Sequence, residues 1–328
     1  MQSLFTLEEL LDARRIVGGV MAATPQYCWP LLRERCGVNV WVKHENHTPT
    51  GAFKVRGGLV YLEKLQQSNA LPAGFITATR GNHGQSIPFA AARHGVGVTV
   101  LVPEGNSVEK NRAMQAWGAE LIVFGEDFDQ AREEAGRLAH TQQLEFVPAF
   151  NKSLVAGVAT YAYELFSAVE NLSRVYVPIG MGSGTCAVLT VRDLLGLQTE
   201  VIGVVSENAP AYALSFEQGS VVETDHARTF ADGLACRVPS KDALELICGG
   251  VTRVVMVSDD EIAAAMRALY TDTHNVAEGA GAAALAALLK DQSEAPLPKD
   301  DAVAIILTGG NVDASLFATV LLGETPVV

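Results

Sequence analysis

The stretch HENHTPTGAFKVRGG, residues 44–58, places one lysine, Lys54, directly after Phe53, where a strand pattern gives way to a helix pattern. A lysine at the start of a helix is ordinarily solvated. In a dry pocket, however, an amine loses its proton more easily, and the neutral amine can form an imine with a carbonyl cofactor. Both interpretations fit this stretch, so the rest of the chain has to distinguish between them.

The composition is that of a globular enzyme with a negative net charge. The chain has 328 residues, of which 48% are hydrophobic, and a net charge of −13. This length is enough for two lobes with a sizeable core. Nucleic acids and anionic membrane surfaces bind basic patches, and no run of Lys and Arg offsets the negative charge. We therefore expect neither as a partner.

The cysteines and the N-terminus predict a cytoplasmic protein. The five cysteines are scattered and none forms a C-x-x-C pair. This pattern is typical of reduced thiols and lacks the cysteine spacing of a metal-binding motif. The opening residues MQSLFTLEELLDARR predict a helix with a capping box formed by Thr6 and Glu9, and do not resemble a signal peptide. The apolar stretch GAGAAALAALL, from Gly279, is too short to span a bilayer.

Short β-branched segments alternate with longer segments of helical spacing. Examples of the helical segments are SVEKNRAMQAWGA and SDDEIAAAMRALYTD, the second with Ser258 as N-cap. Nearly continuous apolar strands between helices predict an α/β protein with doubly wound, mostly parallel sheets. The predicted strands are VNVWVKHE (from Val38), FITAT (from Phe75), VTVLVP (from Val98), ELIVF (from Glu120), RVYVPIG (from Arg174), EVIGVVS (from Glu200), RVVMVS (from Arg253) and AVAIILTGG (from Ala302).

Glycine-rich loops follow several of these strands, and ligands of open α/β sheets bind beyond the carboxyl ends of the strands. The loop VPIGMGSGTCAV alternates Gly180, Gly182 and Gly184 before a helix. Backbone N–H groups there can approach an anion such as a phosphate. It matches neither the nucleoside-triphosphate loop nor G-x-G-x-x-G. A tight strand–helix connection would look similar.

Two further loops carry polar side chains at predicted strand ends. In TATRGNHGQS, Gly81 allows a tight turn, and the Asn82 side chain has both hydrogen-bond donors and an acceptor. His83 is either a general base or a residue that stabilises the loop by hydrogen bonds. In LTGGNVD, Thr308 places a neutral hydroxyl at the carboxyl end of the last predicted strand. The alternative is that this loop is an ordinary turn that ends the strand. Each loop is ambiguous when taken alone.

Together, PTGAFKVRG, GNHGQ, GMGSG and TGGNVD occur in the order and spacing of one family. The chain resembles the fold-type II pyridoxal-phosphate enzymes, which have the two-lobed fold of the tryptophan synthase β subunit. Within these it is similar to the threonine/serine dehydratase group, which includes serine racemase and hydroxyaspartate dehydratases. The resemblance covers nearly the whole chain and favours a Schiff-base lysine at Lys54.

The resemblance implies roles for residues around pyridoxal 5′-phosphate. Lys54 would hold the cofactor and move protons at the substrate Cα. Phe53 would lie against the ring, Asn82 would bond to its 3′-hydroxyl, and Glu278 would lie nearby. Thr308 takes the place where relatives put Ser or Cys facing the ring nitrogen. The phosphate would be held by Gly180, Met181, Gly182, Ser183 and Gly184.

The substrate would be a small amino acid held by the loop after the Phe75 strand and by Asn151, which matches a family asparagine near the cofactor. Its carboxylate would meet the backbone groups of residues 80–83. The expected reaction removes water from a β-hydroxy amino acid such as threonine, serine or 3-hydroxyaspartate, giving a 2-oxo acid and ammonia. The predicted substrate-binding residues are Thr79, Arg80, Gly81, Asn82, His83 and Asn151.

Arg80 departs from the family pattern, which has a small residue here. Racemases use a serine at this place as a second acid/base, and arginine is too basic for that task. One hypothesis is that Arg80 binds a second substrate carboxylate, as in 3-hydroxyaspartate. The alternative, which we prefer from the sequence, is that it points away and pairs with a surface or interdomain acid.

Other activities of the fold are less well supported. Racemisation is disfavoured by Arg80, and β-replacement of the cysteine-synthase type is disfavoured by His83, where that group usually has threonine. A non-catalytic binding module is disfavoured by Lys54 together with Asn82. No divalent metal is expected, because the carboxylates of related metal sites are replaced by Val205 and Ala211, and Glu207 lies in a shifted register.

The resemblance also implies a domain division. Residues 1–65 and 152–328 would form a large cofactor-binding domain, and residues 66–151 a small mobile domain that closes over the substrate. We expect a homodimer. We find no segment that resembles the C-terminal amino-acid-sensing domain of biosynthetic threonine deaminases, so feedback by isoleucine is not expected.

Overall fold

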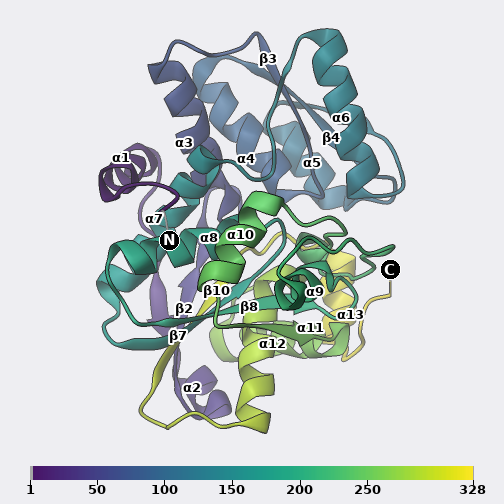
Figure 1. Cartoon of the computed structure of the whole chain (residues 1–328). Helices are drawn as coiled ribbons and strands as arrows, with labels where there is room; N and C mark the ends of the chain where they lie inside the picture. The colour runs from purple at the N-terminus through teal and green to yellow at the C-terminus, as the bar shows by residue number, and fades with distance from the viewer. Residues whose placement is uncertain (1–2, 328) are drawn as a thin grey trace.

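The apolar segments form two separate sheets in the computed structural model, which describes residues 3–327 (Figure 1). The large lobe holds a six-stranded sheet of order β1-β2-β10-β7-β8-β9, and the small lobe a four-stranded sheet of order β5-β4-β3-β6. Only β1 and β2 pair antiparallel among the described strands. The strands are β1 (Gln26–Cys28), β2 (Asn39–His44), β3 (Gly74–Ala78), β4 (Gly97–Val102), β5 (Ala119–Val123), β6 (Glu145–Phe146), β7 (Leu172–Pro178), β8 (Glu200–Ser206), β9 (Arg253–Val257) and β10 (Ala302–Leu307).

The predicted α/β class with mostly parallel sheets is confirmed, and so are all eight predicted strands. The sequence did not reveal β1 and β6, because segments of three and two residues are too short to show a period. All five residues of β3 are buried, as expected of a strand covered on both faces.

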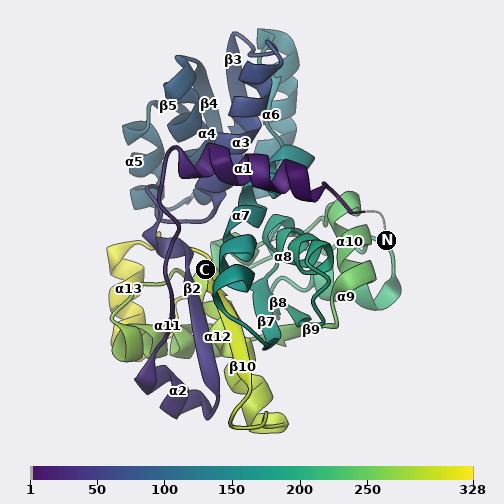
Figure 2. The ribbon, with the colours of Figure 1, turned by 90° about the vertical axis from the view of Figure 1, so that its left-hand side faces the viewer.

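Helices cover both faces of the larger sheet, with α8 packed on β7 and β8 and α12 packed on β7 to β10. In Figure 2, α1 crosses the junction of the two lobes, where it contacts α3 and α7. The helices are α1 (Leu7–Gly18), α2 (Pro30–Cys36), α3 (Lys54–Gln67), α4 (Asn82–Ala91), α5 (Val108–Ala116), α6 (Phe128–Gln142), α7 (Lys152–Ala168), α8 (Ser183–Leu194), α9 (Ala211–Gln218), α10 (Lys241–Gly250), α11 (Asp259–Thr273), α12 (Gly279–Glu294) and α13 (Ala314–Leu321), with 3₁₀ turns η1 (Glu45–His47), η2 (Ala92–His94) and η3 (Asp232–Leu234).

The predicted starts of α1 and α11 are confirmed at the level of individual hydrogen bonds. The Glu9 N–H donates to the Thr6 hydroxyl at 3.2 Å, and the Thr6 N–H donates to the Glu9 carboxylate at 2.7 Å. Ser258 and Glu261 form the same reciprocal pair at the start of α11. Each pair satisfies two N–H groups that the helix itself leaves without a partner.

A buried ion cluster fixes the first turn of α3. Arg56 is fully buried, and its Nε donates to Glu45 at 2.7 Å while its Nη1 donates to Glu164 at 2.8 Å. Lys43 on β2 donates to the same Glu164 at 2.6 Å. The cluster therefore ties α3 to β2, η1 and α7, and with them it fixes the position of the neighbouring Lys54.

Glycines let α3 lie directly against two other helices. A Cβ at Gly58 would overlap Ser86 of α4, and a Cβ at Gly157 of α7 would overlap the Arg56 carbonyl oxygen. The Ser86 hydroxyl donates to the Lys54 carbonyl at 2.6 Å across the first contact. This close approach brings the helix that begins with Asn82 next to the helix that begins with Lys54.

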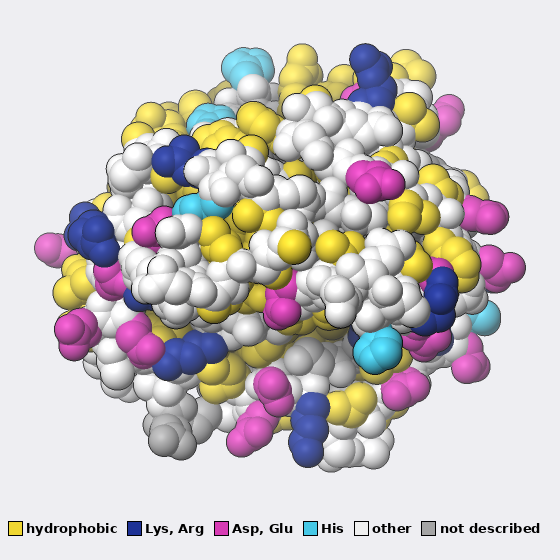
Figure 3. Space-filling model, turned by 90° about the horizontal axis from the view of Figure 1, so that it is seen from above, with side chains coloured by type: hydrophobic (Ala, Val, Ile, Leu, Met, Phe, Trp, Pro, Cys, Tyr) yellow, Lys and Arg dark blue, Asp and Glu magenta, His cyan; other side chains and the backbone are white. Residues whose placement is uncertain are grey.

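Acidic and basic side chains lie interspersed on the face of the molecule in Figure 3. Among the described residues, the helices are all too short or too polar to cross a membrane.

Replacing Gly157 by Ala should lower the free energy of unfolding by about 1–3 kcal/mol, because the added methyl group forces α7 away from α3. The matched control is Gly136→Ala in the interior of α6. Gly136 is exposed and no atom lies within 4 Å of its Cβ position. That substitution should raise the free energy of unfolding by about 0.5–1 kcal/mol. Denaturant titration measures both, and equal effects of the same sign would contradict the packing argument.

Candidate active site

One cavity between the lobes is lined by every predicted site residue except Asn151. Its walls come from the loop after β3, the start of α3, the glycine loop before α8, η3, the start of α12 and the end of β10. The predicted residues that line it are Phe53, Lys54, Thr79, Arg80, Gly81, Asn82, His83, Gly180, Met181, Gly182, Ser183, Gly184, Glu278 and Thr308.

Asn151 lies outside this lining. Its side chain accepts a hydrogen bond from the Ser153 N–H at 2.8 Å and caps α7. A residue in an N-cap position already has a structural role. A role of Asn151 in substrate binding stays a prediction that the cavity does not support.

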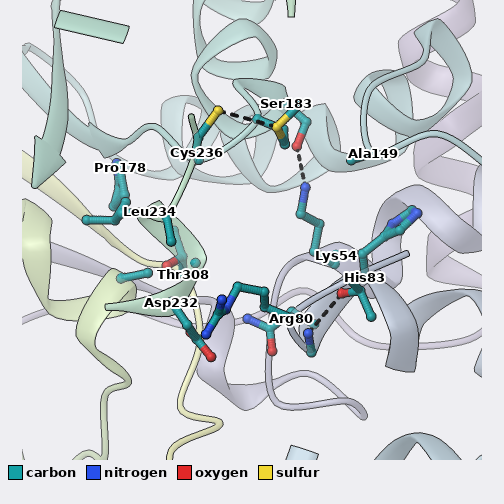
Figure 4. Close-up of a pocket in the computed structure, with 18 of the residues that line it drawn as sticks. Lys54, Arg80, His83, Ala149, Pro178, Ser183, Asp232, Leu234, Cys236 and Thr308 are labelled. Atoms are coloured by element: carbon teal, nitrogen blue, oxygen red, sulfur yellow. Dashed lines mark hydrogen bonds between the residues drawn. The ribbon is translucent and has the colours of Figure 1, made fainter. Parts of the chain in front are cut away.

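Lys54 extends across the cavity toward Ser183 (Figure 4). Its Nζ donates to the Ser183 hydroxyl at 2.8 Å and lies 5.0 Å from the centre of the Phe53 ring. Burial disfavours the charged amine and lowers the pKa of Lys54 to about 8. A substantial fraction of the amine is then neutral near pH 8 and can attack a carbonyl group.

The glycine loop presents bare backbone to the cavity. Gly182 has φ +87°, in the left-handed region, and a Cβ there would lie 2.7 Å from the Cβ of Ala243. At Gly180 a Cβ would overlap the Gly233 carbonyl oxygen. The loop leads directly into the N-terminus of α8, where free N–H groups and the helix dipole favour an anion.

Asn82 is held by two side chains from the large lobe. Its amide NH₂ donates to Glu278 at 2.6 Å, and its amide oxygen accepts from Asn311 at 2.9 Å. An amide NH₂ has two donor hydrogens, so one remains for a ligand. The sequence motif TGGNVD contains Asn311, but nothing in the sequence showed that its side chain positions Asn82.

Thr308 closes the cavity from the side of the large lobe. Its side chain is buried, and its carbonyl oxygen accepts from the Phe53 N–H at 3.0 Å. That backbone contact places the end of β10 beside the start of α3. Thr308 thus presents a neutral hydroxyl to the same space as Lys54.

His83 is buried in the cavity wall, and burial and the nearby Lys54 lower its pKa to about 3. The imidazole is therefore neutral over the physiological pH range. The neutral His83 ring is suited to hydrogen bonding rather than to pairing with an anion as a cation.

A buried cation that the sequence did not reveal lies beside Asn82. Lys110 of α5 donates to Asp232 of η3 at 2.7 Å and lies 3.0 Å from Glu278. Although burial opposes it, these two carboxylates raise the pKa of Lys110 above its ordinary value. Burial raises the pKa of Glu278, and Lys110 opposes that change. The sequence pattern around Lys110 resembles any exposed helix start, so no signal marked it.

Arg80 follows β3 and faces the cavity among the residues drawn in Figure 4. Its Nε is buried and has no hydrogen-bond partner. Among residues 3–327 no acidic side chain forms an ion pair with it. The expectation that Arg80 pairs with a surface or interdomain acid is therefore not met.

Val205 and Ala211 occupy the two positions at which a divalent metal site would need carboxylates. Val205 is buried in β8, and Ala211 is the first residue of α9. Within the described part of the chain, no three His, Cys, Asp or Glu side chains are grouped as metal ligands. The absence of a divalent ion remains a prediction.

Replacing Lys110 by Met should lower the free energy of unfolding by about 3 kcal/mol, because it leaves the Glu278 and Asp232 carboxylates facing each other without a cation. The control is Lys64→Met, which removes a partly exposed pair with Asp12 and should cost less than about 1 kcal/mol. Equal losses in denaturant titration would show that the buried cluster contributes no more than a surface pair.

The residues around Lys54 fit an aromatic aldehyde that carries a phosphate. Lys54 supplies an amine whose positive charge is disfavoured by burial, and the loop before α8 brings the backbone of three glycines to the cavity. Asn82 keeps a donor for a ring hydroxyl, and Thr308 lines the same cavity. These groups match an imine-forming cofactor with an anionic tail better than a nucleotide or a metal.

Comparisons with known proteins agree with this fit. An L-threonine ammonia-lyase of Geobacter sulfurreducens is 35% identical over 289 residues, which cover 88% of this chain and 71% of the relative. Threonine deaminase isoform 2 of Solanum lycopersicum, in its processed form, has a TM-score of 0.86 at 26% identity, with 97% and 94% of the two chains covered. A pyridoxal 5′-phosphate-dependent aspartate racemase has a TM-score of 0.90 at 25% identity, with 96% and 98% covered.

The family model described as "Pyridoxal-phosphate dependent enzyme" matches residues 19–309, which is most of the chain. The match includes every residue that lines the cavity. The chain therefore belongs to the family of pyridoxal-phosphate dependent enzymes.

Proposed function

We propose that this protein is an ammonia-lyase that removes water from a β-hydroxy amino acid and yields a 2-oxo acid and ammonia. The observation that carries the proposal is the half-buried Lys54, whose pKa is lowered to about 8, in the cavity that the family's loops line together. A relative 35% identical to this chain is named L-threonine ammonia-lyase. Threonine and serine are the simplest substrates of this class.

Pyridoxal phosphate, when bound, withdraws electrons from the bond being broken at the substrate Cα. Lys54 would hold it as a Schiff base until the substrate amino group displaces the lysine. The freed Lys54 amine would then take the proton from Cα, and the β-hydroxyl would leave together with a proton as water. The released enamine product would tautomerise and hydrolyse to the 2-oxo acid and ammonia. The backbone groups of residues 80–83 would hold the substrate carboxylate.

Thr308 and Arg80 favour elimination over the alternatives. A neutral Thr308 hydroxyl would not hold a proton on the ring nitrogen as a carboxylate would, so negative charge at Cα is less delocalised and prompt loss of the β-hydroxyl is favoured. Arg80 stands where racemases have a serine, and a guanidinium remains protonated at physiological pH, so it cannot exchange protons with Cα. An aspartate racemase shares the fold, so the chirality of recovered substrate is the test of this point.

We also propose the cytoplasm as location, a homodimer as assembly, and a small domain of residues 66–151 that moves against the rest of the chain. The cysteines are all unpaired in the structure, which supports a reducing compartment. The strands of the smaller sheet all lie within the proposed small domain. Sedimentation analysis of the holoenzyme tests the homodimer.

Replacing Lys54 by Ala should abolish ammonia release from L-threonine, L-serine, 3-hydroxyaspartate and phenylserine, because the amine that moves the proton is gone. Borohydride reduction followed by peptide mass spectrometry should place the cofactor on Lys54 in the unmodified protein. The control, Lys152→Ala, removes an exposed lysine at the start of α7 and should keep both results. Ammonia release that survives in Lys54→Ala would refute the assignment.

The rate at which the cofactor-free protein captures pyridoxal phosphate should rise about ten-fold from pH 7 to pH 9 and then level off. With a pKa of about 8, the neutral fraction of Lys54 grows from about a tenth to about nine tenths over this range. An ordinary lysine, with a pKa near 10.5, would give a rise of about one hundred-fold without a plateau. Borohydride trapping at timed intervals measures the rate. A rise of about one hundred-fold without a plateau would contradict the lowered pKa of Lys54.

A further inference from the structure

Arg80 lies at the boundary of two cavities, and no acid in the described part of the chain forms an ion pair with it. It lines the cavity of Lys54 and also an adjoining one, and both cavities share the side chains of Phe128 and Ala235. Its Nε is buried without a hydrogen-bond partner. A buried donor that stays unpaired costs free energy, and a charged one costs more, so such a group is expected to have a partner when the site is filled.

Two other cations in these walls are already neutralised. Lys110 contacts the carboxylates of Asp232 and Glu278 in the cavity of Lys54. Arg237, in the adjoining cavity, lies 3.0 Å from Asp127 and 3.5 Å from Asp129. A bound anion would gain little from either cation, because their charges are balanced. Arg80 differs from these two in that no acid among residues 3–327 pairs with it. Arg228 also lacks such a partner among these residues, but it is exposed and lines only the adjoining cavity.

Acidic side chains limit how far an anion can extend beyond Arg80. The adjoining cavity is lined by Asp127 and Asp129, which face Arg237, and also by Glu126 and Asp225. A carboxylate that reached deep into this space would meet like charges. An acidic group close to the reacting carbon avoids them and still reaches Arg80.

We propose that Arg80 binds a second carboxylate on the substrate, so that the preferred substrate is a short dicarboxylic β-hydroxy amino acid, with 3-hydroxyaspartate as the smallest case. This proposal rests on the ammonia-lyase function and names its substrate class. A guanidinium suits this task because it presents two parallel N–H donors to a carboxylate and keeps its charge at every physiological pH.

Binding of L-aspartate and L-asparagine to the holoenzyme tests the contact independently of turnover. The two ligands have the same shape, lack a β-hydroxyl to eliminate, and differ in one negative charge. Calorimetry should show L-aspartate binding at least ten-fold more tightly than L-asparagine in the unmodified protein. Arg80→Gln should reduce that ratio at least ten-fold, and Arg80→Lys should reduce it less, because an ammonium keeps the charge but not the paired donors.

The matched control is Arg228→Gln, which removes an arginine that lines only the adjoining cavity. It should leave the ratio of the two affinities within about two-fold of the unmodified protein. Equal binding of L-aspartate and L-asparagine by the unmodified protein would overturn the proposal without any variant. A ratio that falls equally in Arg80→Gln and Arg228→Gln would also overturn it, because the effect would then be one of general charge.

Turnover separates this proposal from the proposed function. Ammonia release should favour 3-hydroxyaspartate over L-serine in kcat/KM, and Arg80→Gln should lower that preference at least ten-fold. If ammonia is released from L-serine and the preference is unchanged in Arg80→Gln, the function stands and the carboxylate contact is wrong. If no β-hydroxy amino acid releases ammonia but L-aspartate still binds through Arg80, the contact stands and the reaction is wrong.

Discussion

The buried pairing of Arg56 with Glu45 and Glu164 is the constraint on which the site depends. Taking these charges out of water is unfavourable, and their mutual contacts offset that cost only while all of them are in place. Removing one partner of such a group typically costs about 3–5 kcal/mol. Because Arg56 stands two residues after Lys54, the same contacts that hold the helix also fix the lysine at the cavity wall.

Close backbone packing extends this constraint to the small lobe. Gly58 and Gly157 let α3 lie against α4 and α7 without intervening side chains, and the Ser86 hydroxyl bonds to the Lys54 carbonyl. The start of α4 thus reaches the start of α3, and Asn82 meets Glu278 of the large lobe. Two lobes with separate sheets therefore contribute to one cavity, which Lys54 and Asn82 both line.

Charge is distributed unevenly within that cavity, and the distribution accounts for the roles of its cations. Lys110 is balanced by two carboxylates and connects the lobes. Desolvation lowers the pKa of Lys54, and no acid among the described residues pairs with it. Arg80 has an Nε without a hydrogen-bond partner among the described residues and lines the cavity of Lys54. The acids around each cation thus separate the structural role of Lys110 from the nucleophilic role of Lys54 and the recognition role of Arg80.

The sequence by itself determined eight of the ten strands, the capped helix starts and the loops that hold Lys54, Asn82, the glycines and Thr308. Apolar periodicity, capping residues and glycine spacing are local signals. The tertiary structure alone decided which charges meet. Lys110 and Asp232 are 122 residues apart in the chain, and Asn311 and Asn82 are 229 apart. It also placed Asn151 at a helix cap and left the Arg80 Nε without a hydrogen-bond partner among the described residues. Ion pairing and burial depend on three-dimensional distance, which no local pattern records.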